Sequence, residues 1–195
     1  MARIRLSPDP SFVAQARLRS AAHSAMLSIA ILIGAGCTTP ALAPPDVPAS
    51  VRAPVGQEPF LEALASGVQI YECAAKGSQS AFDWAFRAPE AALADRSGRA
   101  IGKHYAGPTW ESVDGSAVVG DAKARDPGPD PSAIPWLLLT AKSSTGTGVF
   151  TQTKSIQRVK TVGGTAPAQA CGATNVGEIA RVPYTATYYF YRVAP

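Results

Sequence analysis

The fold is decided by the segment Phe82-Asp83-Trp84-Ala85-Phe86-Arg87, in which aromatic residues occupy every second position. This period of two places Phe82, Trp84 and Phe86 on one face of an extended chain, which is typical of a half-buried β-strand. Residues 58–64, by contrast, predict a short helical turn. Further strands are expected at 68–74, 99–105, 109–113, 116–124, 134–141, 148–160 and 184–192. The pattern predicts an all-β fold, a single antiparallel β-sandwich or a small β-barrel of about seven to nine strands.

The composition excludes several classes of protein. The 195 residues are 46% hydrophobic and 16% charged, with 17 Gly and 17 Pro, which fits neither a coiled coil nor a highly charged disordered chain. The net charge is +4, but four of the 18 basic and only one of the 14 acidic residues precede Cys37, which leaves +1 on residues 37–195. No basic cluster remains there that could follow a phosphate backbone, so nucleic-acid binding is not expected.

The N-terminal residues have the layout of a signal peptide. The basic residues Arg17 and Arg19 precede the uncharged apolar run 25–36, which is shorter than the roughly 20 residues of a membrane span. Gly34-Ala35-Gly36-Cys37 resembles a bacterial lipobox, in which the cysteine is lipidated, whereas Ala41-Leu42-Ala43 resembles a cleavage site for release. We favour lipidation of Cys37, and hence a lipid anchor in a membrane, because a Pro-rich segment suited to a tether follows it.

These features predict a chain of three parts: a signal peptide over 1–36, a Pro-rich tether over 37–55 and a β-rich globular domain over 56–195. Residue 38 is Thr, not the Asp that would favour retention in an inner membrane. We therefore expect an outer-membrane lipoprotein or a periplasmic protein, with secretion as the alternative.

Two cysteines, Cys73 and Cys171, remain after Cys37. An oxidising compartment would pair them, so they are expected to form a disulfide that joins the first strand to the connection before the last strand. Two unrelated buried thiols are the alternative. No metal site is expected, because neither cysteine has another Cys or a His nearby in the sequence.

One polar cluster could carry catalysis. His104 is the only histidine after Cys37, and Glu111 or Asp114 could orient its imidazole in a small hydrolase or isomerase. The simpler interpretation is that His104 is a packed or surface residue and that Glu111 pairs with Lys103. No cofactor motif accompanies this cluster.

The aromatic residues offer a second interpretation, a pocket for a small apolar or sugar ligand. Trp110 follows the turn-like Gly107-Pro108, where a large ring is more easily exposed, and Tyr105 and Lys103 lie close to it in the sequence. We favour this interpretation, a non-catalytic module that binds a small ligand, a glycan or an envelope protein. The oligomeric state stays open. The aromatic residues considered for the pocket are Trp84, Trp110, Trp136, Tyr71, Tyr105, Tyr184, Tyr188, Tyr189 and Tyr191.

Five ordered segments carry a resemblance to a known family. They are Gly67–Cys73, Trp84–Ala91, Gly102–Glu111, Ala133–Leu138 and Val159–Gly164. Together they resemble DUF3455, a family without an assigned activity, over about residues 46–192. The resemblance implies an exported domain and supplies no catalytic residues.

Overall fold

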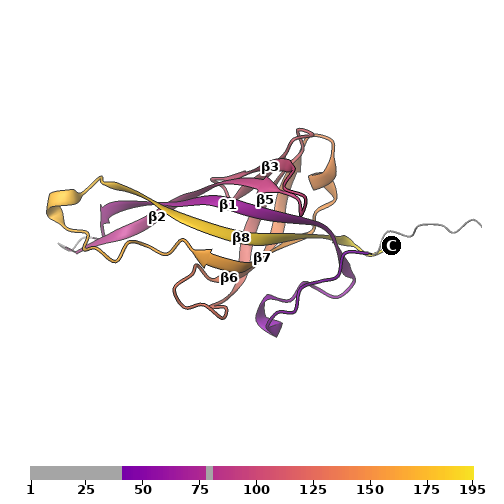
Figure 1. Cartoon of the computed structure of the whole chain (residues 1–195), viewed down its shortest axis with the longest axis horizontal. Coiled ribbons are helices and arrows are strands. Elements are labelled where there is room, and N and C mark those ends of the chain that lie inside the picture. Colours follow the sequence, from indigo (N-terminus) through magenta and orange to yellow (C-terminus); the bar gives the residue numbers. More distant parts are fainter. Residues whose placement is uncertain (1–40, 78–80) are drawn as a thin grey trace, which may run out of the picture. The chain divides into compact units, whose positions relative to one another are not determined.

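The computed structural model describes residues 41–77 and 81–195 (Figure 1). The expected signal peptide over 1–36 and the expected lipidation site Cys37 lie outside the described residues. Eight antiparallel strands pair in sequence order, and β8 pairs with β1 to close a barrel. The all-β prediction is confirmed, and the protein adopts the barrel of the two architectures that the sequence left open.

The strands are β1 (Gln57–Ala75), β2 (Phe82–Ala94), β3 (Ala100–Tyr105), β4 (Thr109–Ser112), β5 (Ala117–Asp126), β6 (Trp136–Thr145), β7 (Ser155–Gly163) and β8 (Ile179–Val193). Three short 3₁₀ helices are η1 (Ala49–Val51), η2 (Val149–Gln152) and η3 (Ala173–Asn175). In the described part of the chain, no helix is long and apolar enough to cross a membrane.

Strand β1 begins earlier than the sequence pattern predicts. The helical turn expected over 58–64 is wrong, because these residues are extended and pair with β8. A register shift between Pro59 and Leu61 interrupts the pairing. Such a bulge adds one residue to the strand, so the alternation of inward and outward residues is broken and the sequence there lacks a period of two. Pairing with β2 starts only at Leu64, so Pro59 lies where β1 has one neighbouring strand and a missing N–H is tolerated.

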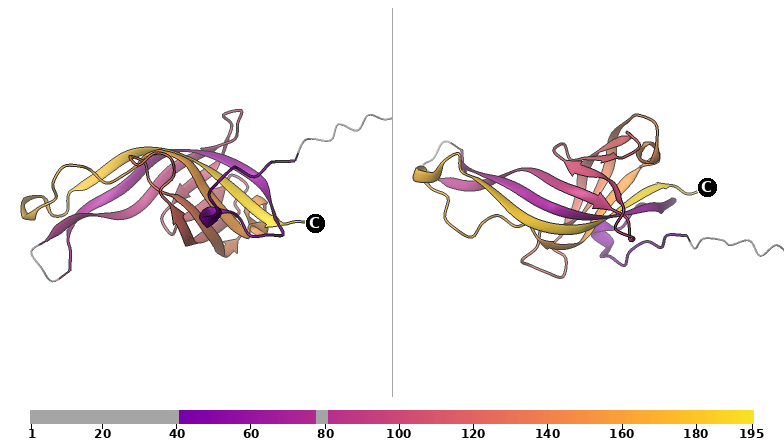
Figure 2. Two further views of the ribbon diagram at one scale, coloured as in Figure 1. Left: turned by 90° about the horizontal axis from the view of Figure 1, so that it is seen from below. Right: turned by 45° about the horizontal axis from the view of Figure 1, so that its top comes forward.

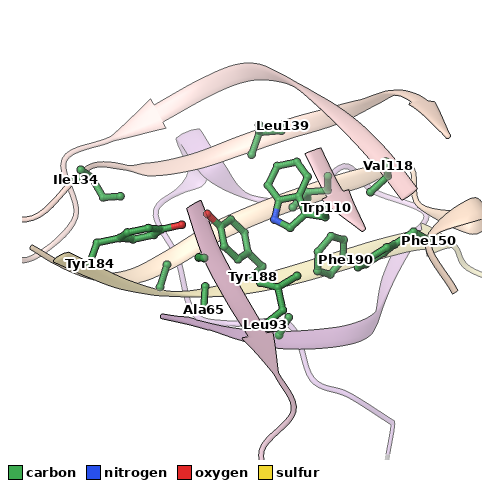
Figure 3. Close-up of a cluster of buried hydrophobic side chains, with 14 residues drawn as sticks. Ala65, Leu93, Trp110, Val118, Ile134, Leu139, Phe150, Tyr184, Tyr188 and Phe190 are labelled. Carbon is green, nitrogen blue, oxygen red and sulfur yellow. The ribbon is translucent and has the colours of Figure 1, made fainter. Parts of the chain in front are cut away.

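Alternate residues of the strands fill the barrel interior. On β8, Tyr184, Ala186, Tyr188 and Phe190 belong to the central hydrophobic cluster, as the period of two requires. Figure 3 shows Trp110 of β4 beside Tyr188 and Phe190 in this cluster. The ring centroid of Trp110 lies 5.3 Å from that of Tyr188 and 6.0 Å from that of Phe190. The interior is therefore a packed aromatic core.

The segment before β1 packs on the outside of the barrel. Val47 and Val51 are 7% and 0% exposed and contact Tyr189 and Tyr191, which point outward from β8. The buried amide of Gln157 donates to the Val51 carbonyl at 2.5 Å. Part of the segment expected to be a tether over 37–55 therefore packs against the barrel, ahead of residue 56.

Strands β1, β2 and β8 continue beyond the barrel as a ribbon of three strands (Figures 1 and 2). The connection between β7 and β8 folds onto this ribbon, where Trp84 Nε1 donates to the Gln169 carbonyl at 2.9 Å. The predicted disulfide between Cys73 and Cys171 is confirmed, with Cα atoms 5.5 Å apart. It joins β1 to the connection before β8, and Tyr71 and Trp84 complete a small hydrophobic cluster around it.

Candidate functional site

A cavity of about 380 Å³ lies beside the hairpin that joins β3 to β4. This volume falls within the roughly 300–1,000 Å³ of small-molecule sites. Its apolar wall comes from the four strands β2, β4, β6 and β8 and contains Phe86, Trp110, Leu137, Leu139 and Tyr188. The polar residues at the cavity are Arg87, His104 and Arg158, and Ala122 is an exposed small residue on β5 that also lines it.

His104 is held inside the barrel in its neutral form. Its side chain stacks on Trp110 with ring centroids 4.3 Å apart, and Nδ1–H donates to the Thr109 carbonyl at 2.8 Å. Burial lowers the pKa of His104 to about 3, the Thr109 hydrogen bond opposes this shift, and the charge of Arg158 adds to it. At neutral pH the ring is uncharged, and Nε2 is an acceptor with no hydrogen bond to a described residue.

The structure does not bring Glu111 to His104. The register of β3 and β4 pairs His104 with Trp110 and Lys103 with Glu111, and successive residues of a strand point to opposite faces. Glu111 accepts a hydrogen bond from the Tyr105 hydroxyl at 2.7 Å and lies 3.2 Å from Lys103 Nζ. The hydrogen bond from Tyr105, together with Lys103, lowers the pKa of Glu111. The proposed acid–base pair of His104 and Glu111 is therefore not assembled.

The three residues expected to bind a ligand are divided between the two faces. Lys103 and Tyr105 lie on the outer face with Glu111, whereas Trp110 lines the cavity. Trp110 lies in a strand, β4, as predicted, but its ring is not exposed beside the turn: it is 1% exposed. Its ring passes over Gly120 of β5, where a Cβ atom would lie 2.8 Å from it.

Two cavity residues carry buried polar atoms without a partner. Trp110 Nε1 and the Tyr188 hydroxyl form no hydrogen bond to any described residue. The hydroxyl of Tyr184 and Nε2 of Gln69 likewise form no hydrogen bond of normal geometry to a described residue. Figure 3 shows the hydroxyls of Tyr184 and Tyr188 turned toward each other, and the two groups lie close enough to shift each other's pKa. Buried polar atoms are nearly always hydrogen-bonded, so we expect a polar ligand atom or a water molecule to form hydrogen bonds with these four atoms.

Arg158 is the site residue that the sequence analysis missed. It is partly buried on β7, directly opposite Tyr188 of β8. Burial raises the pKa of Tyr188, and the charge of Arg158 opposes this rise. Among the described residues, no carboxylate lies within ion-pair distance of Arg158; its Nε and Nη2 donate to the Pro135 carbonyl at 3.2 Å and 2.8 Å.

Within residues 41–77 and 81–195, no three His, Cys, Asp or Glu side chains are grouped so that they could hold a metal ion.

Comparison with known families gives one match. The family model described as a protein of unknown function, DUF3455, matches residues 54–192. The chain belongs to this family. Every residue that lines the cavity lies within the DUF3455 region, as do both cysteines of the disulfide. The DUF3455 match begins after Val47 and Val51, so the packed N-terminal segment lies outside it.

No curated protein matches the DUF3455 chain. No solved structure matches it either.

Proposed function

We propose that this protein is a binding module that holds a small, largely apolar ligand in the barrel cavity. The observation that carries the proposal is the combination of an apolar cavity with the unpartnered buried donors Trp110 Nε1 and Tyr188 OH. Such a cavity with a few converging polar groups is the usual form of a small-molecule site. A glycan or a protein partner has less support, because the cavity wall is mainly apolar.

The separation of His104 from Glu111 also favours binding over the hydrolase or isomerase interpretation. A general base works best with a pKa near the working pH, whereas burial lowers the pKa of His104 to about 3. Its Nδ1–H is held by a backbone carbonyl rather than by a carboxylate. In the proposed function, His104 contributes a flat neutral ring and one acceptor atom to the wall.

Filling the entrance of the cavity should abolish binding. We expect Ala122→Trp to weaken binding of the neutral apolar dye N-phenylnaphthylamine at least tenfold, because Ala122 is exposed at the cavity and the indole ring would occupy the space. The measurement is a fluorescence titration of the dye with the purified protein. The matched control is Ala92→Trp, which places the same ring at an exposed position of β2 on the outer face.

The control should bind the dye as the unaltered protein does, and both variants should retain the β-rich circular dichroism spectrum. Equal binding by the Ala122→Trp and Ala92→Trp variants would show that the dye binds elsewhere. Absence of saturable binding by the unaltered protein for the dye and also for octanol, octanoate, naphthoate and the methyl ester of naphthoate would contradict the proposed function.

We also propose that the domain acts after export, anchored by lipid on Cys37. The disulfide supports export, since structural disulfides persist in oxidising compartments. Leu42 packs against the cluster around Val47 and Val51. Cleavage at the alternative site after Ala43 would remove Leu42 from that cluster, which favours Cys37 as the mature N-terminus.

Mass spectrometry of the mature N-terminus tests the attachment. We expect an N-terminal peptide that starts at Cys37 and carries a diacylglycerol, and we expect the intact protein to partition into detergent. An unmodified N-terminus at Pro44 would show a released protein instead.

A further inference from the structure

We propose that the ligand of the cavity is a small amphipathic monocarboxylate, whose carboxylate binds Arg158 and whose apolar body lies against Trp110 and Leu139. This inference rests on the ligand-binding function proposed above and names the chemical class of the ligand.

Among the described residues, no anion pairs with the charge of Arg158 inside the barrel. The other cation at the cavity, Arg87, is compensated by Glu72, with Nε 2.9 Å from the carboxylate. Arg158 faces a carbonyl, aromatic rings and aliphatic side chains. Its positive charge acts to lower the pKa values of Tyr71, His104 and Tyr188. A partly buried cation is costly unless an anion pairs with it. The site therefore favours a ligand that brings negative charge.

The donors of Arg158 that remain free suit a carboxylate. Its Nε–H and one Nη2–H are directed to the Pro135 carbonyl, which occupies one side of the planar guanidinium. The outer edge, with the Nη1 hydrogens and the second Nη2 hydrogen, makes no other hydrogen bond of normal geometry to a described residue, although Arg158 lies close enough to the Tyr188 hydroxyl to lower its pKa. That edge offers two parallel N–H groups, the arrangement that a carboxylate accepts in bidentate fashion. Tyr188, opposite Arg158 on β8, provides an unpartnered hydroxyl beside it.

The rest of the wall limits the charge and size of the ligand. Arg158 supplies one uncompensated positive charge, and His104 is neutral, so a single negative charge balances the site and a dianionic phosphate would exceed it. The apolar part of the wall, Phe86, Trp110, Leu137 and Leu139, can be contacted by an alkyl chain or an aromatic ring. The cavity of about 380 Å³ limits that body to a short chain or a small ring system.

Matched pairs of probes test the charge preference by isothermal titration calorimetry at neutral pH. Octanoate is compared with octanol, and naphthoate with its methyl ester, because each pair shares a body and differs in charge. We expect the unaltered protein to bind each carboxylate at least tenfold more tightly than its neutral partner. In Arg158→Met this preference should disappear while octanol binds at least as well, because the side-chain volume is retained and the charge is not.

Two further variants keep the test decisive. Arg158→Lys keeps the charge and a donor for Pro135 but lacks the planar fork, so part of the preference for octanoate should remain. Arg181→Met removes a cation of β8 that does not line the cavity and that is already paired with Glu90, 2.8 Å away, so the preference should change less than threefold. If Arg158→Met does not fold, the probe pairs on the unaltered protein and on Arg158→Lys still decide the question.

Equal affinity of the unaltered protein for octanoate and octanol, or a preference that survives in Arg158→Met, would overturn the carboxylate assignment while the proposed binding function stood. Failure of all four probes and of the dye to bind would instead remove the binding function itself. Competition of octanoate with N-phenylnaphthylamine, lost in the Ala122→Trp variant, would place the carboxylate in the cavity.

Discussion

We expect the free energy of unfolding to fall by about 4 to 5 kcal/mol when Cys73 and Cys171 are both replaced by serine. The disulfide closes a loop with a sequence separation of 98 residues. In the chain-entropy model, a loop of about 100 residues corresponds to about 4.7 kcal/mol, because the cross-link restricts the unfolded chain. For a protein of this size, that loss lowers Tm by roughly 10 to 20 °C. Urea unfolding and calorimetry measure the two quantities.

Two controls separate the cross-link from the side chains. Cys73 is fully buried, so a serine hydroxyl at that position adds its own cost of burial. The pair Cys73→Ala and Cys171→Ala avoids this cost and should lose slightly less stability than the serine pair. Treating the unaltered protein with a reductant should bring it to the stability of the alanine pair. If the oxidised protein and the alanine pair unfold within about 1 kcal/mol of each other, the loop-closure argument fails.

Local sequence patterns predict the strands whose alternation is undisturbed. The aromatic alternation of 82–87 lies in β2, and the terminal aromatic segment 184–192 lies in β8. The cysteine pairing was predictable because the two cysteines that follow Cys37 have only one way to pair with each other. The first half of β1 was not predictable, since the bulge between Pro59 and Leu61 removes the periodic signal.

The candidate site was only partly predictable, because it depends on closure of the barrel. Trp110 and Tyr188 were recognised as ligand-binding candidates from their aromatic character, and both line the cavity. Arg158 was missed for a physical reason. On β7, Ile156 faces the interior and Val159 faces the packed N-terminal segment, so both faces of the strand are buried. Alternation cannot then show which face is the inner one, and a charged residue is normally assigned to solvent.

The interior position of His104 makes the stability of the protein sensitive to acid. The pKa of His104 is lowered from 6.5 to about 3 by burial, so between these values the unfolded chain binds a proton that the folded protein does not. Unfolding therefore becomes more favourable as the pH falls. As the pH falls from about 7.5 to about 5, we expect protonation of His104 in the unfolded chain to reduce the free energy of unfolding by about 2 kcal/mol, with a slope of up to about 1.4 kcal/mol per pH unit.

Comparison with His104→Asn isolates this effect. The asparagine amide can donate to the Thr109 carbonyl in place of Nδ1–H but does not titrate. The free energy of unfolding of the unaltered protein minus that of the variant should fall by about 2 kcal/mol as the pH is lowered over that range, whatever this difference is at neutral pH. The carboxyl groups of Asp95 and Asp114 have pKa values of about 2 in the folded protein and are unchanged in the variant, so their contribution cancels. Parallel pH profiles for the two proteins would mean that His104 gains a proton in the folded barrel, and that the cavity admits enough water to solvate an imidazolium ion beside Arg158.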